Sequence, residues 1–278
     1  MSAHRTQVVA PNLPPEHIAS GQTEPAPQLL PSIQLREFVS GKYGATGLST
    51  GTATFVPGAV LPYHVHSCSE AITILEGMAV VSVQGRSYNL YPLDSIHVPA
   101  GVAHQVTTRS QSEPMKAHWA FATDEPSREF VAAPFDPVDI ADGLPSSGNP
   151  ENVMRLSSLS PYELADGTRF YDLFAGRFGS VGICGGYGEF NRGAGLPCHT
   201  HNYDESITIA KGSAHCFVAG RKYLLSNCDT ALVPKGNPHR FVNASDDVMG
   251  MIWVYAGSEP ERTLLDVRYC EGSLVWPD

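Results

Sequence analysis

Residues 58–77 read GAVLPYHVHSCSEAITILEG, and residues 193–212 read GAGLPCHTHNYDESITIAKG. Both stretches carry a glycine, two histidines separated by one residue, a glutamate and a second glycine at identical intervals. Side chains two residues apart on a strand project from the same face, so each histidine pair would point at one spot. The glutamate four residues later could bring a carboxylate to the same place. The sequence therefore predicts the same polar cluster twice.

A shorter pattern follows each stretch. Residues 93–104 read LDSIHVPAGVAH and residues 228–239 read CDTALVPKGNPH, each with Pro-x-Gly ahead of a histidine. Proline ends a strand ladder and glycine lets the chain bend, which would return a third imidazole to each pair. Three imidazoles and one carboxylate suit a divalent first-row metal at a partly open site. The predicted metal ligands are His64, His66, Glu70 and His104 in the first half, and His199, His201, Glu205 and His239 in the second.

These intervals resemble those of the cupin superfamily, specifically the two-domain bicupins of the quercetin dioxygenase-like, conserved-barrel type. The family's first motif, G-x5-H-x-H-x3-E-x6-G, is matched at every position in both halves. Its second motif, G-x5-P-x-G-x2-H-x3-N, is matched at the proline, the second glycine and the histidine. Leu93 and Cys228 replace the opening glycine, and Thr108 replaces the final asparagine that Asn243 retains. These departures concern turn geometry, because none of the replaced positions is a metal ligand in the family.

The similarity between the halves extends beyond the motifs. Of the 64 aligned positions between 41–104 and 176–239, 27 are identical, including five glycines that interrupt short apolar runs. Short strands separated by glycine-containing turns are typical of an antiparallel barrel or sandwich. Together with the resemblance, this predicts an all-β fold of two tandem jelly-roll barrels that arose by internal duplication.

We expect four regions along the chain. Residues 1–34 form a proline-rich arm, 35–123 the N-terminal barrel, 124–155 a linker, and 156–278 the C-terminal barrel with its tail. The arm has no sustained periodicity, so composition leaves open whether it is disordered or lies across a partner subunit.

Composition narrows the possible partners. A formal net charge of −10 and a pI near 5.5 argue against nucleic acid and anionic membranes, which both attract basic surfaces. No apolar run approaches the roughly 20 residues that cross a bilayer, and the first 30 residues lack the apolar core of a signal peptide. We therefore expect a cytoplasmic protein with a small-molecule substrate and no nucleic-acid or membrane partner. A homo-oligomer is left open.

The cysteines are spread singly, without a C-x-x-C pair, and are predicted to be reduced thiols. They are Cys68, Cys184, Cys198, Cys216, Cys228 and Cys270. Cys68 and Cys198 each lie within two residues of a predicted ligand. We interpret both as small packing residues, with a thiol lining the pocket as the alternative.

Other candidate side chains have simpler explanations. Histidines without a mirrored counterpart are interpreted as structural: His4, His17, His97, His118 and His215. Four residues beside the predicted ligands could line a pocket, but neighbours of an inward-facing strand residue usually face outward. These four, interpreted as packing or surface residues, are Tyr63, Gln105, Thr200 and Tyr203.

Three kinds of function fit the predicted site. The resemblance favours a mononuclear non-haem dioxygenase acting on a small oxygen-bearing substrate, with Glu70 and Glu205 as catalytic carboxylates that tune charge or act as a base. The first alternative is a non-redox isomerase, lyase or decarboxylase. Oxalate decarboxylases look like this overall, but in them an arginine precedes the first histidine pair, where this chain has Leu61-Pro62 and Leu196-Pro197. The second alternative is a non-catalytic, metal-stabilised binding protein.

One divalent transition metal is expected in each barrel. The resemblance favours Fe²⁺ or Mn²⁺, and the donor set also accepts Ni²⁺, Co²⁺ or Zn²⁺. The residues around the two sets differ, since Cys68 in the first half corresponds to Tyr203 in the second. We therefore expect two metals but one productive pocket, and the sequence leaves open which barrel contains it.

Overall fold

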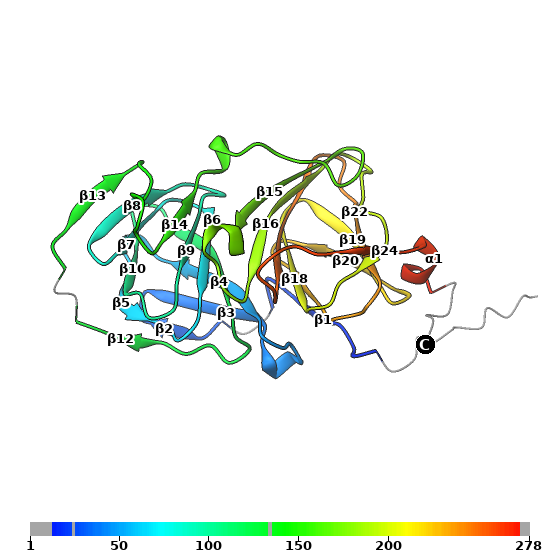
Figure 1. Cartoon of the computed structure of the whole chain (residues 1–278), viewed down its shortest axis with the longest axis horizontal. Helices are drawn as coiled ribbons and strands as arrows, with labels where there is room; N and C mark the ends of the chain where they lie inside the picture. Colours follow the sequence, from blue (N-terminus) through cyan, green and yellow to red (C-terminus); the bar gives the residue numbers. More distant parts are fainter. Residues whose placement is uncertain (1–12, 24–25, 133–134, 273–278) are drawn as a thin grey trace, which may run out of the picture.

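Two β-barrels lie side by side in the computed structural model, which describes residues 13–23, 26–132 and 135–272 (Figure 1). Each barrel is built from two sheets, and nearly all neighbouring strands are antiparallel. The longest helix in the described part of the chain is the four-residue α1 (Val267–Cys270). The predicted all-β fold with two barrels is therefore confirmed.

The N-terminal barrel has a seven-stranded and a six-stranded sheet. The first sheet contains, in spatial order, β14 (Asn152–Met154), β9 (Ser95–Val98), β6 (Glu70–Glu76), β11 (Met115–Phe121), β4 (Ser49–Phe55), β3 (Ile33–Val39) and β2 (Gln28–Leu30). The second contains β12 (Glu129–Phe130), β5 (Val60–Val65), β10 (His104–Thr108), β7 (Ala79–Val83), β8 (Arg86–Leu90) and β13 (Val138–Ala141).

The C-terminal barrel repeats this plan. Its first sheet contains β1 (His17–Ala19), β21 (Thr230–Val233), β18 (Glu205–Lys211), β23 (Met249–Tyr255), β16 (Cys184–Phe190) and β15 (Thr168–Phe174). Its second contains β20 (Arg221–Ser226), β19 (Ser213–Val218), β22 (His239–Asn243), β17 (His199–Thr200) and β24 (Thr263–Leu264). Three 3-10 turns connect strands: η1 (Gly41–Tyr43), η2 (Leu156–Ser158) and η3 (Gly176–Phe178).

Alternation along β6 and β18 fills the barrels with apolar side chains. Ile72 and Ile74 of β6, like Ile207 and Ile209 of β18, belong to the core of their own barrel. Glu70 opens β6 on the same face as its two isoleucines, which directs its carboxylate inward. A third apolar cluster, with members such as Phe38 and Phe174, contains residues of both barrels. Each barrel thus has its own core, and the two share a buried interface.

Left-handed backbone conformations occur where the motifs predict turns. The hairpin residues Gln84-Gly85 and Ala219-Gly220 have positive φ, as a two-residue turn requires. Leu93 and Cys228 also have positive φ, 70° and 66°, at the positions where the family motif has glycine. The turn is therefore preserved in both halves although neither residue is glycine, and a side chain in this region carries a conformational cost.

Each barrel is completed by a strand from the segment that precedes the other barrel. β1 pairs with β21 of the C-terminal barrel, and β14 pairs with β9 of the N-terminal barrel in the matching register. The residue before each strand fastens it: Glu16 binds Arg221 and Tyr223, and Glu151 binds Arg86 and Tyr88 at equivalent positions. We call this arrangement the reciprocal strand exchange. The region boundaries 1–34 and 124–155 expected from the sequence stay a prediction.

Candidate metal centres

The first candidate centre is assembled at the meeting point of three strands. His64 is the penultimate residue of β5, His104 begins β10, and these two residues face each other in the register of the second sheet. Glu70 begins β6 of the other sheet, and His66 lies in the turn between β5 and β6. The Gly101 N–H donates to the carbonyl of His66 at 2.8 Å, which fastens the Pro-x-Gly turn beside the histidine pair. The sequence pattern thus brings all four side chains together.

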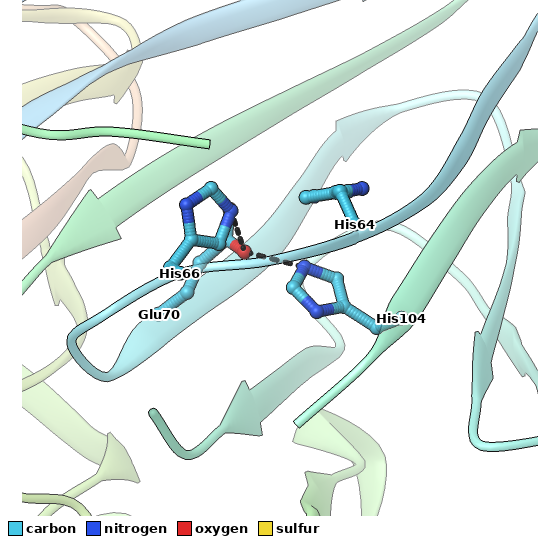
Figure 2. Close-up of side chains that lie close together, drawn as sticks. All are labelled: His64, His66, Glu70 and His104. Atoms are coloured by element: carbon cyan, nitrogen blue, oxygen red, sulfur yellow. Dashed lines mark hydrogen bonds and ion pairs between the residues drawn. The ribbon is translucent and has the colours of Figure 1, made fainter. Parts of the chain in front are cut away.

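The donor atoms of this set converge (Figure 2). All four lie within 4.8 Å of one another, and every residue in the set is buried. The Glu70 carboxylate oxygen Oε2 lies 2.7 Å from His104 Nε2 and 3.3 Å from His66 Nε2. His64 Nε2 is buried without a hydrogen-bond partner among the described residues.

Backbone carbonyls orient the three rings. The Nδ1 atom of His64 lies 2.8 Å from the carbonyl oxygen of Pro62, and that of His104 lies 3.0 Å from the carbonyl oxygen of Val102. His66 Nδ1 contacts the carbonyl of Ser127. When Nδ1 donates a proton to a carbonyl, the Nε2 lone pair is free to bind a metal, and such contacts commonly orient histidine ligands.

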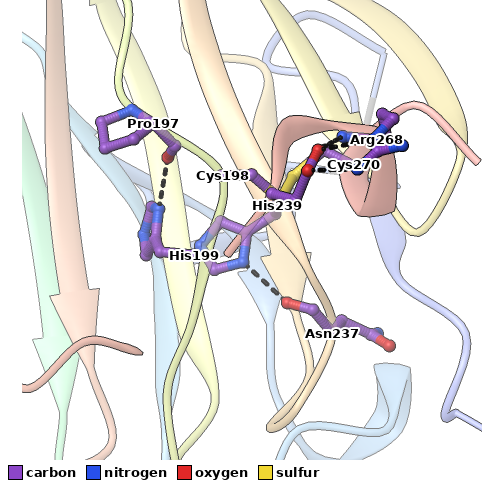
Figure 3. Close-up of a disulfide and its surroundings, with 8 residues drawn as sticks. Pro197, Cys198, His199, Asn237, His239, Arg268 and Cys270 are labelled. Atoms are coloured by element: carbon purple, nitrogen blue, oxygen red, sulfur yellow. Dashed lines mark hydrogen bonds and ion pairs between the residues drawn. A yellow bond between two sulfur atoms is a disulfide. The ribbon is translucent and has the colours of Figure 1, made fainter. Parts of the chain in front are cut away.

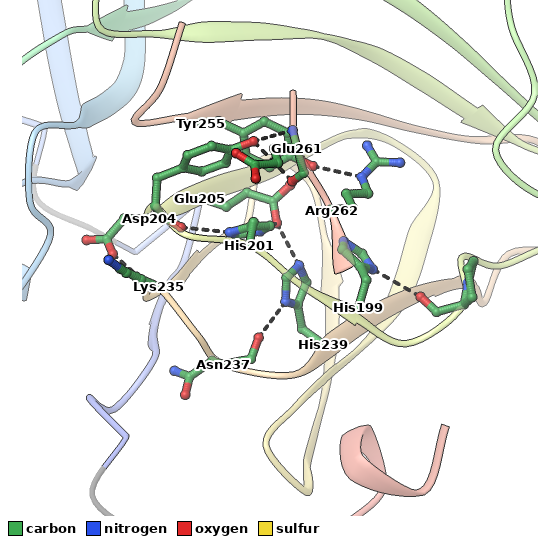
Figure 4. A network of polar contacts seen from close by, with 12 residues as sticks. His199, His201, Asp204, Glu205, Lys235, Asn237, His239, Tyr255, Glu261 and Arg262 are labelled. Atoms are coloured by element: carbon green, nitrogen blue, oxygen red, sulfur yellow. Dashed lines mark hydrogen bonds and ion pairs between the residues drawn. The ribbon is translucent and has the colours of Figure 1, made fainter. Parts of the chain in front are cut away.

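The second centre repeats the first with His199, His201, Glu205 and His239 (Figure 4). Its donor atoms also lie within 4.8 Å of one another, and Glu205 Oε2 is 3.0 Å from His201 Nε2 and 2.8 Å from His239 Nε2. The rings are again oriented by carbonyls, here those of Pro197, Tyr203 and Asn237. All eight predicted ligand residues therefore lie in two compact buried sets, one per barrel.

The electrostatics of both sets fit a bound cation. Burial lowers the pKa of His64 to about 3, and the nearby His104 contributes to the decrease. Burial also holds the pKa of His199 well below its usual value. Burial alone would raise the pKa of Glu70, but His66 and His104 hold it well below the ordinary range. Imidazole nitrogens, one of them unpartnered, and an ionised carboxylate in a buried site are the donor set that a divalent transition metal accepts.

Two arginines that the sequence interpretation missed lie close to the centres. Each belongs to a short segment beside a ligand-bearing strand, which we call a strap. The N-terminal strap, 125–131, contains β12 and pairs with His64, whereas the C-terminal strap, 259–265, contains β24 and pairs with His199. Arg128 and Arg262 occupy equivalent positions in the two straps. The positions before each histidine pair, Leu61-Pro62 and Leu196-Pro197, gave no indication of these arginines, because each arginine comes from a segment distant in sequence.

A sequence signal for the straps was present. Residues 125–128 read EPSR and residues 259–262 read EPER, a repeat offset by 134 residues. The offset within the motifs is 135, and Trp119 and Trp253 already show the shift by one residue. A search for repeats that allowed a single-residue deletion would have found both arginines.

The two arginines differ in their partners. The Nε of Arg262 donates to the hydroxyl of Tyr255 at 3.2 Å. Phe121 occupies the position equivalent to Tyr255, as their pairings with Glu70 and Glu205 show. Because Phe121 has no hydroxyl, the buried Nε of Arg128 has no hydrogen-bond partner in the described part of the chain. Burial lowers the pKa of Arg128, and the Glu70 carboxylate opposes that decrease.

A cavity of about 340 Å³ adjoins the N-terminal centre. Its lining includes the ligand His66, and further residues around it are Leu35, Lys42, Trp119, Phe121 and Arg128. A second cavity, of about 440 Å³, lies at the corresponding place in the C-terminal barrel and includes Arg262. The residues that line it are Tyr162, Leu164, Asp172, Pro260 and Arg262, none of which is a candidate ligand.

Tyr203 explains why the second cavity does not reach its centre. The ring of Tyr203 stacks on that of His201 at 5.2 Å, and its hydroxyl lies within hydrogen-bond distance of the carbonyls of Glu259 and Glu261 in the C-terminal strap. Cys68 stands at the equivalent position and is much smaller. The phenol therefore fills, in the C-terminal barrel, space that the N-terminal barrel leaves open beside its metal ligand.

A disulfide joins Cys198 to Cys270 and corrects the prediction of six reduced thiols (Figure 3). Cys198 precedes the candidate ligand His199, and Cys270 ends α1, just beyond the C-terminal strap. The carbonyl of Cys198 also accepts a hydrogen bond from Leu265 N at 2.8 Å. The strap is thus held to the ligand-bearing strand by both a covalent and a backbone link. The other four cysteines are free thiols.

The remaining candidate residues belong to neither ligand set. Tyr63 is buried and its hydroxyl accepts a hydrogen bond from Gly85 N at 3.1 Å, which is a packing role. Gln105 and Thr200 do not line either cavity. His17, His97, His118 and His215 belong to neither ligand set, and His4 lies outside the described residues. No helix in the described residues has the length and apolarity to cross a membrane.

A family model described as "Cupin domain" matches the chain twice, over residues 51–121 and 186–255, together about half of the chain. Each match contains one complete ligand set. The two sets found by geometry therefore coincide with the two matched domains.

Solved structures share this fold at low sequence identity. An oxalate decarboxylase from Lactobacillus farciminis, solved as a formate complex, superposes with a TM-score of 0.74 at 16% identity, covering 90% of this chain and 88% of that one. The Bacillus subtilis oxalate decarboxylase at pH 4.6 gives 0.71 at 18% identity over 90% and 78% of the two chains. A further structure of the Bacillus subtilis enzyme, described by its Mn(II) centers, gives 0.71 at 17% identity over 90% and 79%.

Among curated proteins, auxin-binding protein T85 from Nicotiana tabacum is 25% identical over 114 residues. The match covers 31% of this chain and 61% of the relative, and T92 from the same plant matches to the same extent. The chain thus spans less than two thirds of the length of these relatives.

Proposed function

Because the chain belongs to the cupin family, with a cupin domain in each half, we propose that it is a metal-dependent enzyme that cleaves or rearranges a small carboxylate substrate without net oxidation. The reaction class is that of a lyase or decarboxylase, and the active site lies in the N-terminal barrel. This is the non-redox alternative drawn from the sequence. The oxalate decarboxylases that share the fold support it better than the dioxygenase hypothesis.

The observation that carries the proposal is the position of Arg128. Its Nε is buried and unpartnered, and the residue lines a cavity whose wall also includes the candidate ligand His66. A partly buried guanidinium whose Nε has no partner is unfavourable, and a carboxylate is the group that its planar donors match best. A substrate carboxylate would supply the missing partner directly beside the metal centre.

The ligand residues have a defined part in this proposal. His64, His66, Glu70 and His104 would hold a divalent transition metal, which supplies Lewis-acid stabilisation of negative charge on substrate oxygen atoms. Mn²⁺ is favoured because one of the similar structures is described by its Mn(II) centers. Glu70 acts here as a ligand that tunes the charge of the centre. A catalytic role for Glu70 or Glu205 as a base stays a prediction.

Arg128 and the cavity perform the remaining tasks. The guanidinium orients the substrate carboxylate, and the apolar walls of Trp119 and Phe121 exclude water from it. In a decarboxylation, the bond between the carboxylate and its neighbouring carbon breaks and carbon dioxide leaves. The electron pair of that bond stays on the carbon and takes up a proton. No external oxidant is consumed in this sequence.

The C-terminal centre has a different part. Tyr203 covers His201, Tyr255 engages Arg262, and the disulfide holds the strap in place. We infer that this centre binds a metal for stability and does not turn over substrate. The expectation of two metals with one productive pocket therefore becomes a specific assignment to the N-terminal barrel.

The test compares Arg128→Gln with Arg262→Gln in protein loaded with Mn²⁺. Carbon dioxide release is measured for a panel of 2-oxo acids and dicarboxylates under argon. Loss of a buried charged hydrogen-bond donor costs about 2–4 kcal/mol, so Arg128→Gln should reduce kcat/KM by about 10² to 10³-fold. Arg262→Gln should retain kcat/KM within about threefold because it leaves the N-terminal cavity unchanged.

Elemental analysis provides the control for both variants. Two ions per chain are expected in the wild type and in both arginine variants, and one ion in His64→Ala and in His199→Ala. Equal losses of activity in the two arginine variants would contradict the assignment to the N-terminal barrel. Turnover that requires stoichiometric oxygen would replace the proposal with the dioxygenase hypothesis.

A further inference from the structure

The cavity beside the N-terminal centre is larger than a two-carbon diacid requires. Its volume of about 340 Å³ lies at the lower end of the range for pockets that hold small organic ligands, roughly 300–1,000 Å³. A ligand that occupied only the space between Arg128 and His66 would leave much of this volume filled with solvent.

The part of the cavity beyond the metal ligand is apolar and aromatic. Leu35, Tyr43, Trp119 and Phe121 supply most of its wall, together with prolines from the N-terminal arm and the strap. Trp119 and Phe121 form a tilted pair with ring centroids 5.3 Å apart. Aromatic and aliphatic walls of this kind bind ring-bearing or aliphatic ligand bodies by burial of apolar surface.

The charged side chains of the wall select one anionic group. Arg128 lines the cavity together with the candidate metal ligand His66, whereas Lys42 and Glu37 lie on the segment formed by β3 and η1. Lys42 donates to the hydroxyl of Tyr43 at 3.0 Å, and Glu37 accepts from Ser40 at 2.9 Å. Lys42 and Glu37 carry opposite charges on this segment and offset each other, which leaves Arg128 as the unbalanced cation of the wall, beside the candidate ligand His66. Glu37 would repel a carboxylate placed beside it.

The C-terminal barrel shows that contact between such a cavity and a metal ligand is not a necessary feature of the fold. Phe170 occupies the position equivalent to Leu35, as their pairings with Gly188 and Ala53 show. The Phe170 ring lies under the guanidinium of Arg262, with its centroid 5.7 Å from Cζ. With Tyr203 in place of Cys68, larger side chains there lie beside the ligands, and the C-terminal cavity includes none of them.

From these observations we propose that the N-terminal site accepts a monocarboxylate with an apolar, ring-bearing body. Its carboxylate binds Arg128 beside the metal centre, and its body lies against Leu35, Trp119 and Phe121. This inference rests on the proposed function, because it uses the same arginine and the same centre. It adds the substrate class, which excludes a compact diacid such as oxalate as the preferred substrate.

The experiment measures binding separately from turnover, using the full chain loaded with Mn²⁺. Isothermal titration compares phenylpyruvate, pyruvate and oxalate as probes, of which the first two share a head group and differ by the ring. Phenylpyruvate should bind about ten- to a hundredfold more tightly than pyruvate, because the ring fills an apolar pocket. Oxalate should bind more weakly than phenylpyruvate.

Two variants of Leu35 test the position of the ring. Leu35→Phe introduces the side chain of the other barrel and should weaken phenylpyruvate binding at least tenfold while changing pyruvate binding by less than threefold. Leu35→Ala enlarges the cavity and should retain tight phenylpyruvate binding, which provides a second readout if Leu35→Phe does not fold. Phe170→Leu is the matched control in the C-terminal barrel and should leave both affinities unchanged.

The outcomes separate this inference from the proposed function. Ring-dependent binding that is lost in Leu35→Phe, without carbon dioxide release from any acid, would support the substrate class and reject the lyase assignment. Preferential binding and decarboxylation of oxalate would reject the substrate class and support the lyase assignment. Equal affinities for phenylpyruvate and pyruvate would also overturn the inference.

Discussion

A single hydroxyl group distinguishes the two arginines. Tyr255 supplies a partner for Arg262, whereas Phe121 leaves the equivalent nitrogen of Arg128 unpartnered. The ligand sets themselves are nearly identical, so the difference between the centres resides in a few neighbouring side chains. The chemistry of each barrel therefore depends on residues that the shared motif does not specify.

His97 provides a test of stability at the same scale. Both of its ring nitrogens are buried without hydrogen-bond partners in the described structure, and burial lowers its pKa to about 4. In the unfolded chain the imidazole of His97 takes up a proton near pH 6.5, whereas in the folded chain it stays neutral down to about pH 4. The free energy of unfolding of the wild type should therefore fall as pH decreases from about 6.5 to 4. This residue alone accounts for about 1.4 kcal/mol per pH unit in that window.

We expect His97→Leu, which introduces the residue found at the equivalent position 232, to remove the contribution of His97 to this pH dependence. The free energy of unfolding should increase by about 1 kcal/mol at pH 7 and by more at pH 5, as measured by urea denaturation. His215→Leu replaces a less buried imidazole and is the control, with a smaller effect. Parallel pH profiles for wild type and His97→Leu would contradict the expectation.

The ligand residues could be predicted because all four of each set lie within one short window of fixed intervals. Strand alternation then determines which side chains share a face. Arg128 could not be found in this way, because it precedes the two-residue strand β12, which has no periodicity, and the strap lies outside the motifs. The prediction of reduced thiols failed for a related reason. Cys270 has no counterpart in the first half, so the repeat gave no indication of a pairing.

At the scale of elements, the two straps pair with equivalent strands, but they differ in how they are held in place. β12 and β24 each cover a ligand-bearing strand, and only the C-terminal strap lies next to a disulfide. Disulfides persist mainly in oxidising compartments, so this bond weighs against the cytoplasmic location expected from the sequence. That location stays a prediction.

Removal of the disulfide should affect the second centre selectively. In the chain-entropy model, a bridge over a sequence separation of 72 contributes up to about 4 kcal/mol, so Cys270→Ser should lower the free energy of unfolding by about 2–4 kcal/mol. The variant should also lose one of its two metals faster to a chelator, because the C-terminal strap is released. Chemical denaturation and timed elemental analysis measure the two effects.

Cys68→Ser changes a free thiol and serves as the control, with little effect on the release of the C-terminal metal. Thiol titration in denaturant should give four groups per wild-type chain before reduction and six after it. Six groups before reduction would show that the bridge does not form.

Across the whole molecule, the reciprocal strand exchange links the stability of each barrel to the segment that precedes the other. Strands β1 and β14 have only three residues each, too few to produce a periodic signal, so sequence patterns could not reveal their partners. The carboxylates that fasten them are almost fully buried, but Arg221 is 53% exposed and Arg86 only 20%.

Glu16→Gln and Glu151→Gln should therefore act across the molecule. Glu151→Gln should destabilise the N-terminal barrel by about 2–3 kcal/mol, and Glu16→Gln the C-terminal barrel by about 1 kcal/mol because its arginine is more solvated. Hydrogen exchange measures the location of each effect, with faster exchange expected in β8 and β9 for the first variant and in β20 and β21 for the second. Each variant is the control for the other. Faster exchange in the N-terminal barrel for Glu16→Gln, or in the C-terminal barrel for Glu151→Gln, would contradict the reciprocal strand exchange.

The same arrangement means that the chain is equivalent to a swapped homodimer whose two copies have been fused end to end. A break in the loop between β13 and β14 would leave two fragments, each with a complete set of donors but each lacking the outer strand that its barrel requires. Such fragments could fold fully only as a complementing pair. The residues around the two metal centres can therefore diverge, while each half still needs the strand that the other half supplies.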